Sequence, residues 1–148
     1  MKKTDLAYTA GIIDGEGCIR ISKRYRNKRY EYNLQVVVES TSEWLVKMLK
    51  FTYGGSISFQ KARDINRQAT WRWTIVCQQA AEFLKLILPY LRLKSPQAEI
   101  AIRFQGGGVK SALPLLSALD EAEFIALKML KRQYKQTGEE RGCSQQVD

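Results

Sequence analysis

The chain has 148 residues, carries 24 Lys and Arg against 15 Asp and Glu, and contains no histidine. This length is enough for one domain with a real core, and no run approaches the ~20 apolar residues that a membrane span needs. Because histidine is absent and the three cysteines lie far apart, zinc fingers and histidine-based catalysis are excluded. Any catalysis must therefore use carboxylates, lysine or a bound cation. The net charge of +9 indicates a polyanionic partner, and the lack of an N-terminal apolar leader predicts an intracellular protein without a membrane partner.

The stretch from Thr4 to Gly17 combines a small-residue helix with a pair of acids. The small residues Ala7, Ala10 and Gly11 recur at spacings of three and four, which places them on one helix face that a second helix can approach closely. Asp and Gly are poor helix formers, so the run 14–17 (DGEG) predicts the end of this helix. A carboxylate and freed backbone carbonyls then lie together, which is an arrangement that hard cations bind.

After this helix the sequence alternates with a period of two, which predicts a β-hairpin with strands at about 18–26 and 30–39 and a turn at Asn27-Lys28. One face of the hairpin is apolar, while the other carries basic and amide side chains. Arg, Asn and Gln are the side chains that read purines in a major groove. The candidate nucleic-acid contacts here are Arg20, Ser22, Arg24, Arg26, Lys28, Asn33 and Gln35. A solvated basic loop is the alternative, but the alternation argues against it.

A second helix is predicted from a cap at Thr41 or Ser42 to a stop at Gly54-Gly55. We expect its apolar residues in the core, namely Trp44, Leu45, Met48, Leu49 and Phe51. Two more strands follow at 56–61 and 70–76, separated by a polar loop, and we expect both tryptophans of the second strand to point inward. The outward or loop residues of this half that we expect to contact nucleic acid are Ser58, Gln60, Arg63, Arg67, Arg72 and Thr74.

The last third of the chain is predicted to be helical. One helix spans about 78–88 and is closed by Pro89, and another begins at Ser95-Pro96 and runs to about 104. A glycine linker precedes a final helix from about 117 to 136. We therefore divide the chain into a core at 1–105, a C-terminal helical extension at 106–137 and a disordered tail at 138–148.

Residues 10–17 (AGIIDGEG) resemble the LAGLIDADG motif of homing endonucleases, with Thr9 in place of the leading Leu and Glu in place of the second Asp. The resemblance implies that Glu16 is the metal ligand, assisted by the Gly15 carbonyl. Residues 89–94 (PYLRLK), followed by Gln97-Ala98, resemble the segment that bears the family's catalytic lysine, which falls here on Lys94.

The predicted order of helix, two strands, helix, two strands and helix is also that of this family. The implied fold class is α+β, an αββαββα unit whose antiparallel β-sheet forms a DNA-binding saddle, with extra C-terminal helices. The chain departs from the family at the end of the second strand. A glutamine of the active-site solvent network is replaced there by Glu39 or Ser40.

By this resemblance we expect a site-specific homing endonuclease that makes a double-strand break in a long, pseudo-palindromic DNA target. The expected cofactor is Mg²⁺, with Mn²⁺ able to substitute and Ca²⁺ supporting binding only. One motif per chain implies a homodimer through the motif helix, with interface residues Ala7, Ala10, Gly11 and Asp14. Lys94 would stabilise charge in the transition state or polarise water. An intron-encoded enzyme of this kind would act in a chloroplast or mitochondrion, or otherwise in bacterial or archaeal cytoplasm.

Two other functions remain open at this stage. An RNA-binding intron maturase would use a similar basic surface and would bind RNA independently of metal. A DNA-binding module of the same fold that has lost catalysis is the other alternative. The presence of Glu16 and Lys94, together with the lack of a helix-turn-helix segment, counts against the second alternative.

Overall fold

The computed structural model describes residues 1–62, 65–106 and 120–133. The predicted Arg63, most of the predicted glycine linker at 106–108, both ends of the predicted final helix and the tail at 138–148 lie outside these ranges. The elements are α1 Lys3–Glu16, β1 Gly17–Arg26, β2 Arg29–Ser40, α2 Glu43–Tyr53, β3 Ser56–Gln60, β4 Thr70–Val76, α3 Cys77–Ile87, the short 3₁₀ helix η1 Leu88–Tyr90, and α4 Ser95–Gly106. A further helix covers 120–133. This order confirms the predicted α+β, αββαββα fold.

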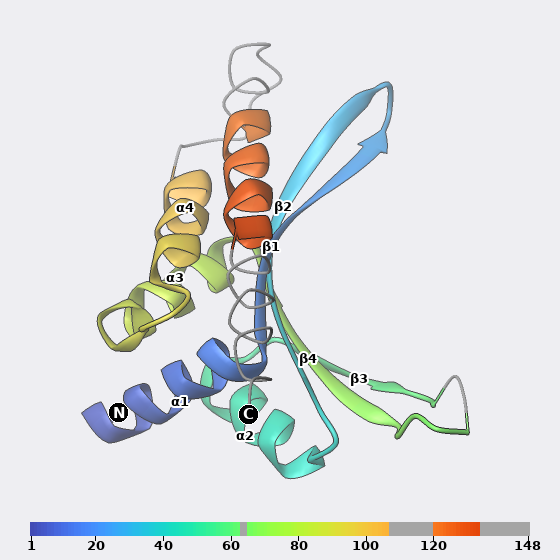
Figure 1. Ribbon diagram of the computed structural model, residues 1–148, viewed down its shortest axis with the longest axis vertical. Helices are drawn as coiled ribbons and strands as arrows, with labels where there is room; N and C mark the ends of the chain where they lie inside the picture. The colour runs from blue at the N-terminus through green and yellow to red at the C-terminus, as the bar shows by residue number, and fades with distance from the viewer. Residues whose placement is uncertain (63–64, 107–119, 134–148) are drawn as a thin grey trace, which may run out of the picture.

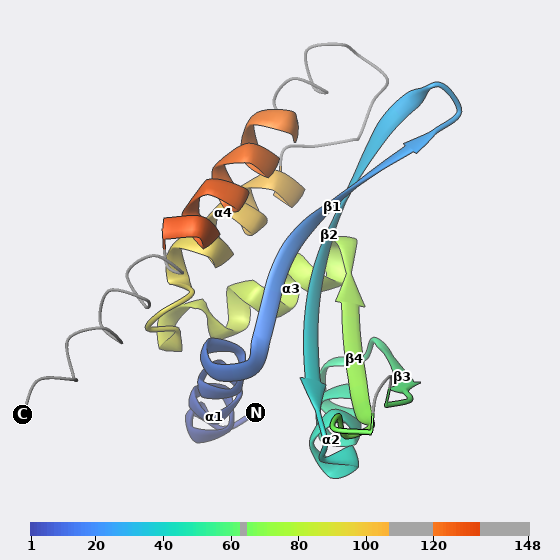
Figure 2. The same cartoon turned by 45° about the vertical axis from the view of Figure 1, so that its right-hand side comes forward.

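The four strands form one antiparallel sheet in the order β1-β2-β4-β3. The helices lie on one side of this sheet, and the other side is left open (Figure 1). The β1–β2 hairpin extends as a long arm beyond the helices, and the β3–β4 hairpin forms a shorter arm at the opposite end (Figures 1 and 2). The sheet is therefore a saddle with one covered and one exposed face.

Local sequence signals account for the turns and the start of α2. Asn27 and Lys28 have φ of 50° and 62°, so the tip of the β1–β2 hairpin is a two-residue turn with left-handed backbone, which asparagine tolerates well. The Ser42 hydroxyl accepts a hydrogen bond from the amide of Leu45 at 3.4 Å and so caps α2. Gly54, with φ of 79°, ends the helix as predicted.

The core lies between the covered face of the sheet and the helices. It includes Ile19, Leu34 and Val36, together with Trp73, whose indole nitrogen donates to the Gly54 carbonyl at 2.8 Å. Both tryptophans of β4 point toward this core, as predicted: Trp73 is fully buried, and Trp71 is partly buried against the cluster.

The predicted core face of α2 is partly wrong. Trp44 is 66% exposed and Phe51 is 94% exposed, whereas Val46 and Leu49 are fully buried. At 3.6 residues per turn, positions 46 and 49 share the face that meets the sheet, and position 51 lies about 200° from position 49 around the helix axis. Counting apolar residues alone did not identify the face.

The helix over 120–133 supports the β1–β2 arm from its covered side. Glu121 accepts a hydrogen bond from the Tyr32 hydroxyl and pairs with the Lys23 ammonium at 2.7 Å. The rings of Tyr32 and Phe124 lie 6.0 Å apart, and Leu127 is 2% exposed. The ends of β1 and β2 are therefore anchored to a segment about a hundred residues later in the chain.

Candidate nucleic-acid interface and metal site

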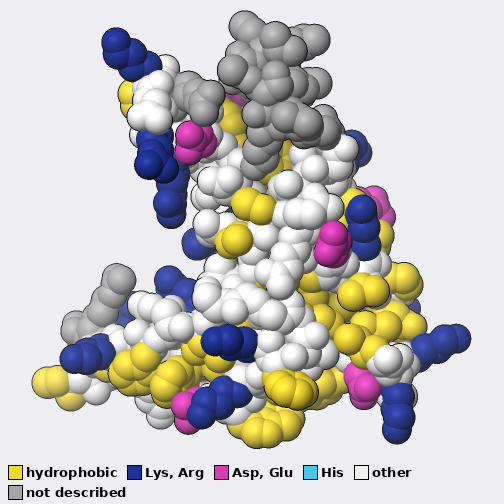
Figure 3. Space-filling model, turned by 180° about the vertical axis from the view of Figure 1, so that it is seen from behind, with side chains coloured by type: hydrophobic (Ala, Val, Ile, Leu, Met, Phe, Trp, Pro, Cys, Tyr) yellow, Lys and Arg dark blue, Asp and Glu magenta, His cyan; other side chains and the backbone are white. Residues whose placement is uncertain are grey.

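The open face of the sheet carries mostly polar side chains, with Val37 and Val76 as apolar members. Because paired residues of an antiparallel sheet point to the same side, the register defines the rows of side chains on this face. The rows that contain the predicted contacts are Arg24 with Glu31, Ser22 with Asn33, Arg20 with Gln35, Ser56 with Thr74, Glu39 with Arg72 and Ser58, and Gln60 with Thr70. Lys and Arg side chains lie on both projecting arms, with a hollow between the arms (Figure 3). The structure thus brings the predicted contacts of both hairpins onto one surface.

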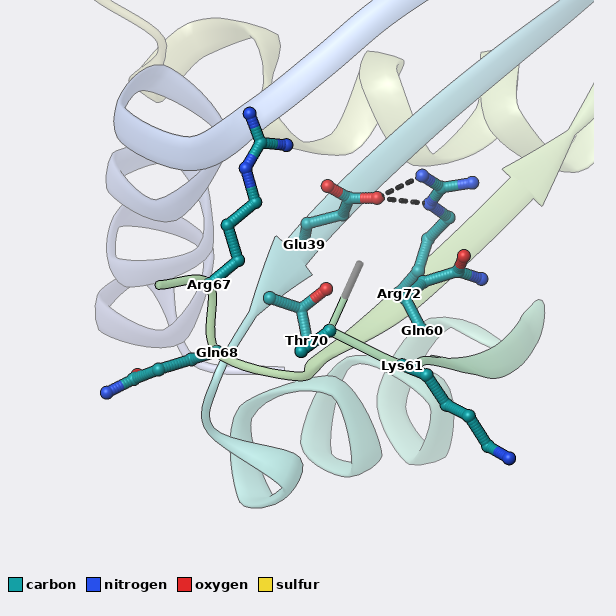
Figure 4. A pocket seen from close by; sticks show the side chains of 8 residues that line it. Glu39, Gln60, Lys61, Arg67, Gln68, Thr70 and Arg72 are labelled. Carbon is teal, nitrogen blue, oxygen red and sulfur yellow. Dashed lines mark hydrogen bonds and ion pairs between the residues drawn. The ribbon is translucent and has the colours of Figure 1, made fainter. Parts of the chain in front are cut away.

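Two arginines of this surface are held by a cross-strand neighbour. The Arg20 Nε donates to Gln35 Oε1 at 3.0 Å. The Arg72 Nε and Nη2 both lie against Glu39 Oε1, as Figure 4 shows. Glu39 is thus partnered with an arginine of β4, and its predicted place in a solvent network stays a prediction. The other candidate, Ser40, accepts a hydrogen bond from the Ser42 amide at 3.1 Å, next to α2.

A polar hollow of about 290 Å³ surrounds the Glu39–Arg72 pair (Figure 4). It is lined by Glu39, Gln60, Lys61, Ala62, Arg67, Gln68, Thr70 and Arg72. The predicted contact Arg67 therefore lies at this hollow, beside the strands rather than on them. Arg26 and Lys28 lie at the exposed tip of the other arm.

The helix α1 continues further than the sequence predicts. It runs through Asp14 and Gly15 to Glu16, and the chain turns into β1 at Gly17. The ammonium of Lys94 donates to the carbonyls of Ile13, Asp14 and Gly17 at 2.7, 2.8 and 2.7 Å. The Ile13 and Asp14 carbonyls belong to the last turn of α1, where a cation interacts favourably with the helix dipole, and the Gly17 carbonyl is at the start of β1. Lys94 therefore explains how helix-poor residues remain helical.

A side chain of α1 also bonds to the backbone of the segment that carries Lys94. The Asp14 carboxylate accepts from the backbone amides of Arg92 at 2.7 Å and Lys94 at 2.9 Å. Both oxygens of Asp14 are thus bonded within the chain at the helix end, and its predicted place at a dimer interface stays a prediction. Burial lowers the pKa of the Lys94 ammonium, and the nearby Asp14 carboxylate opposes this shift.

Glu16 is exposed at the last position of α1. The Lys94 ammonium does not bond to the Gly15 carbonyl, so a carboxylate and a carbonyl, both hard oxygen donors, remain at this helix end. Within the ranges that the structure describes, no three Asp, Glu or Cys side chains lie close enough to hold a metal ion. The donors of this end suit a hard cation, but one chain supplies too few of them.

An exposed strip of small residues runs along α1 to Glu16. Ala7, Gly11 and Gly15 border a surface groove of about 510 Å³, which is also lined by Tyr8, Ile12, Glu16 and Leu45. A Cβ added at Gly11 or Gly15 would meet nothing within 4 Å. Ala10 is fully buried in the chain's own core, which corrects its predicted place at an interface. Gly15 was missed because the helix was expected to end before it.

The saddle, the mostly polar open face and the acid at the end of a small-residue helix form the arrangement that the sequence resemblance implies. Residues 9–104 match the family model described as LAGLIDADG endonuclease. The chain belongs to the LAGLIDADG endonuclease family, a family of DNA nucleases. No curated protein matches the sequence significantly. Within the described residues, no helix has the length and apolar character to cross a membrane.

Solved structures support the fold assignment. The homing endonuclease I-CvuI, solved with a DNA target, superimposes with a TM-score of 0.75 at 19% identity, covering 86% of this chain and 82% of that chain. The archaeal intron-encoded homing endonuclease I-Vdi141I, solved with DNA, gives a TM-score of 0.73 at 16% identity, covering 88% of this chain and 86% of that one. The homing endonuclease I-TnaI gives 0.60 at 14% identity, covering 88% of this chain and 96% of that one.

Proposed function

We propose that this protein is a homing endonuclease that makes a double-strand break in a long DNA target as a homodimer, using Mg²⁺. The observation that carries the proposal is the exposed strip Ala7, Gly11 and Gly15, which leads directly to the carboxylate of Glu16. A closely packed pair of such helices would bring two acids together at one place.

The two-fold arrangement follows from the chemistry of the strip. A symmetric dimer uses the same patch on both subunits, so the patch must be complementary to itself. Small residues at a spacing of four meet this need because they let two helix backbones approach closely. Cutting both DNA strands requires two reaction centres, and each chain offers one Glu16. The dimer would therefore complete the donor set that a single chain lacks.

A divalent cation held by Glu16 and the Gly15 carbonyl, with donors from the partner and from DNA, would generate a nucleophile from water and stabilise charge on the leaving oxygen. Glu16 would hold the cation through its charge, and the closed end of α1 would fix where that charge lies. The structures of I-CvuI with DNA in the presence of Mg or Ca support the choice of cation.

The open face supplies the DNA contacts in this proposal. The strand β1 has 10 residues, which corresponds to about 33 Å, or about nine to ten base pairs of duplex. Two sheets side by side in a dimer would cover about twenty base pairs. The structures of I-CvuI and I-Vdi141I with DNA support double-stranded DNA as the partner.

Incubation with a randomised DNA duplex library and Mg²⁺, followed by sequencing of the cut ends, tests the proposal. We expect one recovered pseudo-palindromic site, cleavage that stops when EDTA removes the cation, and a dimer by sedimentation. The matched control is Glu16→Gln, which keeps the size of the side chain but loses its charge. It should abolish cleavage and leave DNA affinity in Ca²⁺ within a few-fold.

Each other outcome identifies one of the alternatives. Specific DNA binding without cleavage in wild type would indicate a DNA-binding module. Affinity for RNA but not for DNA, independent of the cation, would indicate a maturase. Cleavage by Glu16→Gln at the wild-type rate would show that the motif is structural in this chain.

A further inference from the structure

Two arginine pairs on the open face differ in net charge: Glu39–Arg72 joins β2 and β4, and Arg20–Gln35 joins β1 and β2. Arg20 is held by the uncharged Gln35, so that pair keeps a charge of +1. Arg72 is held by a carboxylate, so its pair has no net charge. Both pairs join register partners of adjacent strands, which fixes the base of each side chain.

The geometry of the pair leaves one edge of the Arg72 guanidinium open. A guanidinium has five N–H donors, and the edge formed by Nε and Nη2 lies against Glu39 Oε1. The end formed by Nη1 and Nη2 keeps three N–H groups, since Nε and Nη2 use one each. This end carries the two parallel donors that read guanine O6 and N7. In Figure 4 the guanidinium lies on the sheet above the polar hollow, beside Gln60.

We propose that Arg72 reads a guanine in each half of the DNA target, and that Glu39 is a positioning residue that holds the guanidinium for this contact. The proposal rests on the DNA-binding function proposed above and names one specificity-determining residue within it. Because the pair has no net charge, Arg72 supplies base selectivity while adding little to attraction for phosphates. Arg20, whose partner is neutral, supplies both.

The proposal predicts different results for two measurements, the salt dependence of DNA affinity and the base preference at one position. Contacts to phosphate release counterions. Each such contact therefore steepens the slope of log affinity against log salt concentration by about one. Contacts to bases change the preference at one position and leave the slope nearly unchanged. A base contact made by a neutral pair should therefore change selectivity alone. No phosphate-binding lysine or arginine would behave in this way.

The experiment selects binders from a randomised DNA duplex library in Ca²⁺, which separates binding from cleavage, and then measures affinity for the selected duplex across a series of salt concentrations. Arg72→Ala should remove the guanine preference at one base pair of each half-site, a loss of about 10- to 100-fold. Because Arg72→Ala leaves the Glu39 carboxylate unpaired, its salt slope should become shallower by about one. The double variant Arg72→Ala/Glu39→Ala removes the neutral pair as a whole, so it should lose the same preference at the wild-type slope. Arg72→Lys keeps the charge but lacks the paired donors, so it should lose the same preference.

Substitutions of Glu39 test the positioning role, and one of them copies the Arg20–Gln35 pair of the same chain. Glu39→Gln converts the pair into the Arg20–Gln35 type, with an oxygen that still accepts from Arg72. It should keep the guanine preference, bind all duplexes several-fold more tightly at low salt, and steepen the slope by about one. Glu39→Ala leaves no acceptor, so it should lose the preference while steepening the slope in the same way.

A matched control lies on the other side of the molecule. Arg103 and Glu123 form an ion pair of the same kind between α4 and the helix at 120–133, with Nε and Oε1 2.6 Å apart. Arg103→Ala should change neither base preference nor slope, and thermal melting of every variant shows whether it is folded. Weakening by Arg72→Ala that is uniform across all duplexes, with the base preference intact, would make Arg72 a phosphate contact and overturn the proposal. Wild-type protein that selects no duplex would instead overturn the proposed function.

Discussion

The end of α1 and the open face of the sheet are built by different kinds of contact. At the end of α1, the side chains of Lys94 and Asp14 each bond to backbone groups of the other segment. On the open face, Arg20 and Arg72 bond to other exposed side chains. Contacts to the backbone fix the position of an element, whereas pairs of exposed side chains can be exchanged without moving it. In the proposed enzyme, the place of cleavage would therefore be built into the fold, and the DNA sequence that is read would not.

The largest effect that separates these regions is expected from Gly11→Leu. A Cβ at this position meets nothing within 4 Å in the single chain, and leucine favours helix over glycine by about 1 kcal/mol. We therefore expect the folded monomer to be at least as stable as wild type. The longer side chain would hold two α1 helices apart, so dimer formation and cleavage should both be lost. Sedimentation and a cleavage assay measure the two results.

The control for this variant is Gly17→Leu. A Cβ at Gly17 would lie 2.7 Å from the Ile13 carbonyl oxygen, inside the chain itself. This variant should lose the folded monomer, in contrast to Gly11→Leu. A dimer of Gly11→Leu with wild-type activity would place the subunit contact elsewhere on the molecule.

A smaller effect is expected from Lys94→Met, which removes the ammonium from three carbonyls. Hydrogen bonds from a charged group are worth about 1.5–3 kcal/mol each but do not add, and burial of the ammonium is itself costly. We expect a loss of about 2–3 kcal/mol in the free energy of unfolding, measured in urea. Cleavage should fall as well, because the end of α1 that bears Glu16 would loosen.

The role of Lys94 can be separated from direct catalysis by a second substitution. Asp14→Asn weakens the opposite half of the same contact, in which the Asp14 carboxylate accepts from the backbone amides of Arg92 and Lys94. If the contact acts as a unit, the double variant Lys94→Met/Asp14→Asn should lose less stability than the sum of the two single variants. Full stability of Lys94→Met would leave catalysis as the function of this lysine.

Periodicity predicted most of the fold because local chemistry decides it. The alternation from Gly17 onward and the Asn27-Lys28 turn fix the hairpin, and the glycines at 54 and 55 fix the end of α2. The end of α1 could not be predicted in this way, because the lysine that satisfies its carbonyls lies about 80 residues later. The pairing of Glu39 with Arg72 likewise depends on β4 lying beside β2, which only the folded sheet determines.

The exposed strip on α1 shows the same limit. The spacing of small residues was read correctly, but Ala10 faces the core and Gly15 faces outward. Which side of a helix meets the sheet depends on the packing of α1 against its neighbours. A helix with small residues on several sides does not contain that information in its own sequence.

The tip of the long arm should show a moderate effect confined to DNA binding. Arg26 and Lys28 are exposed and far from the core. We expect Lys28→Ala to weaken binding of all duplexes a few-fold and to make the salt slope shallower by about one, as for a phosphate contact. Thermal stability should stay within about 0.5 kcal/mol of wild type, as for other surface changes. A loss confined to one base pair would make this lysine a base reader.

The smallest effect is expected from Glu121→Gln, which probes the support behind the arm. The hydrogen bond from Lys23 lowers the pKa of the Glu121 carboxyl, with a second contribution from Tyr32. Because the pKa is lowered in the folded state, the charged carboxylate stabilises the protein at any pH above the pKa of the unfolded state. That stabilisation is lost as the pH falls from about 4.5 through the folded-state pKa. Wild type should therefore melt slightly above Glu121→Gln at pH 7 and at the same temperature at low pH.

The same substitution connects the support to recognition. Lys23 and Tyr32 lie on the covered face of β1 and β2, directly beside the row of Ser22 and Asn33 on the open face. If the helix at 120–133 fixes the orientation of the arm, Glu121→Gln should reduce base preference in the outer part of each half-site by a few-fold, although Glu121 itself contacts no DNA. Arg132→Ala, which removes an exposed charge from the same helix and is not among the groups that shift the Glu121 pKa, is the matched control. Equal base preferences in wild type and Glu121→Gln would show that the arm keeps its orientation without this support.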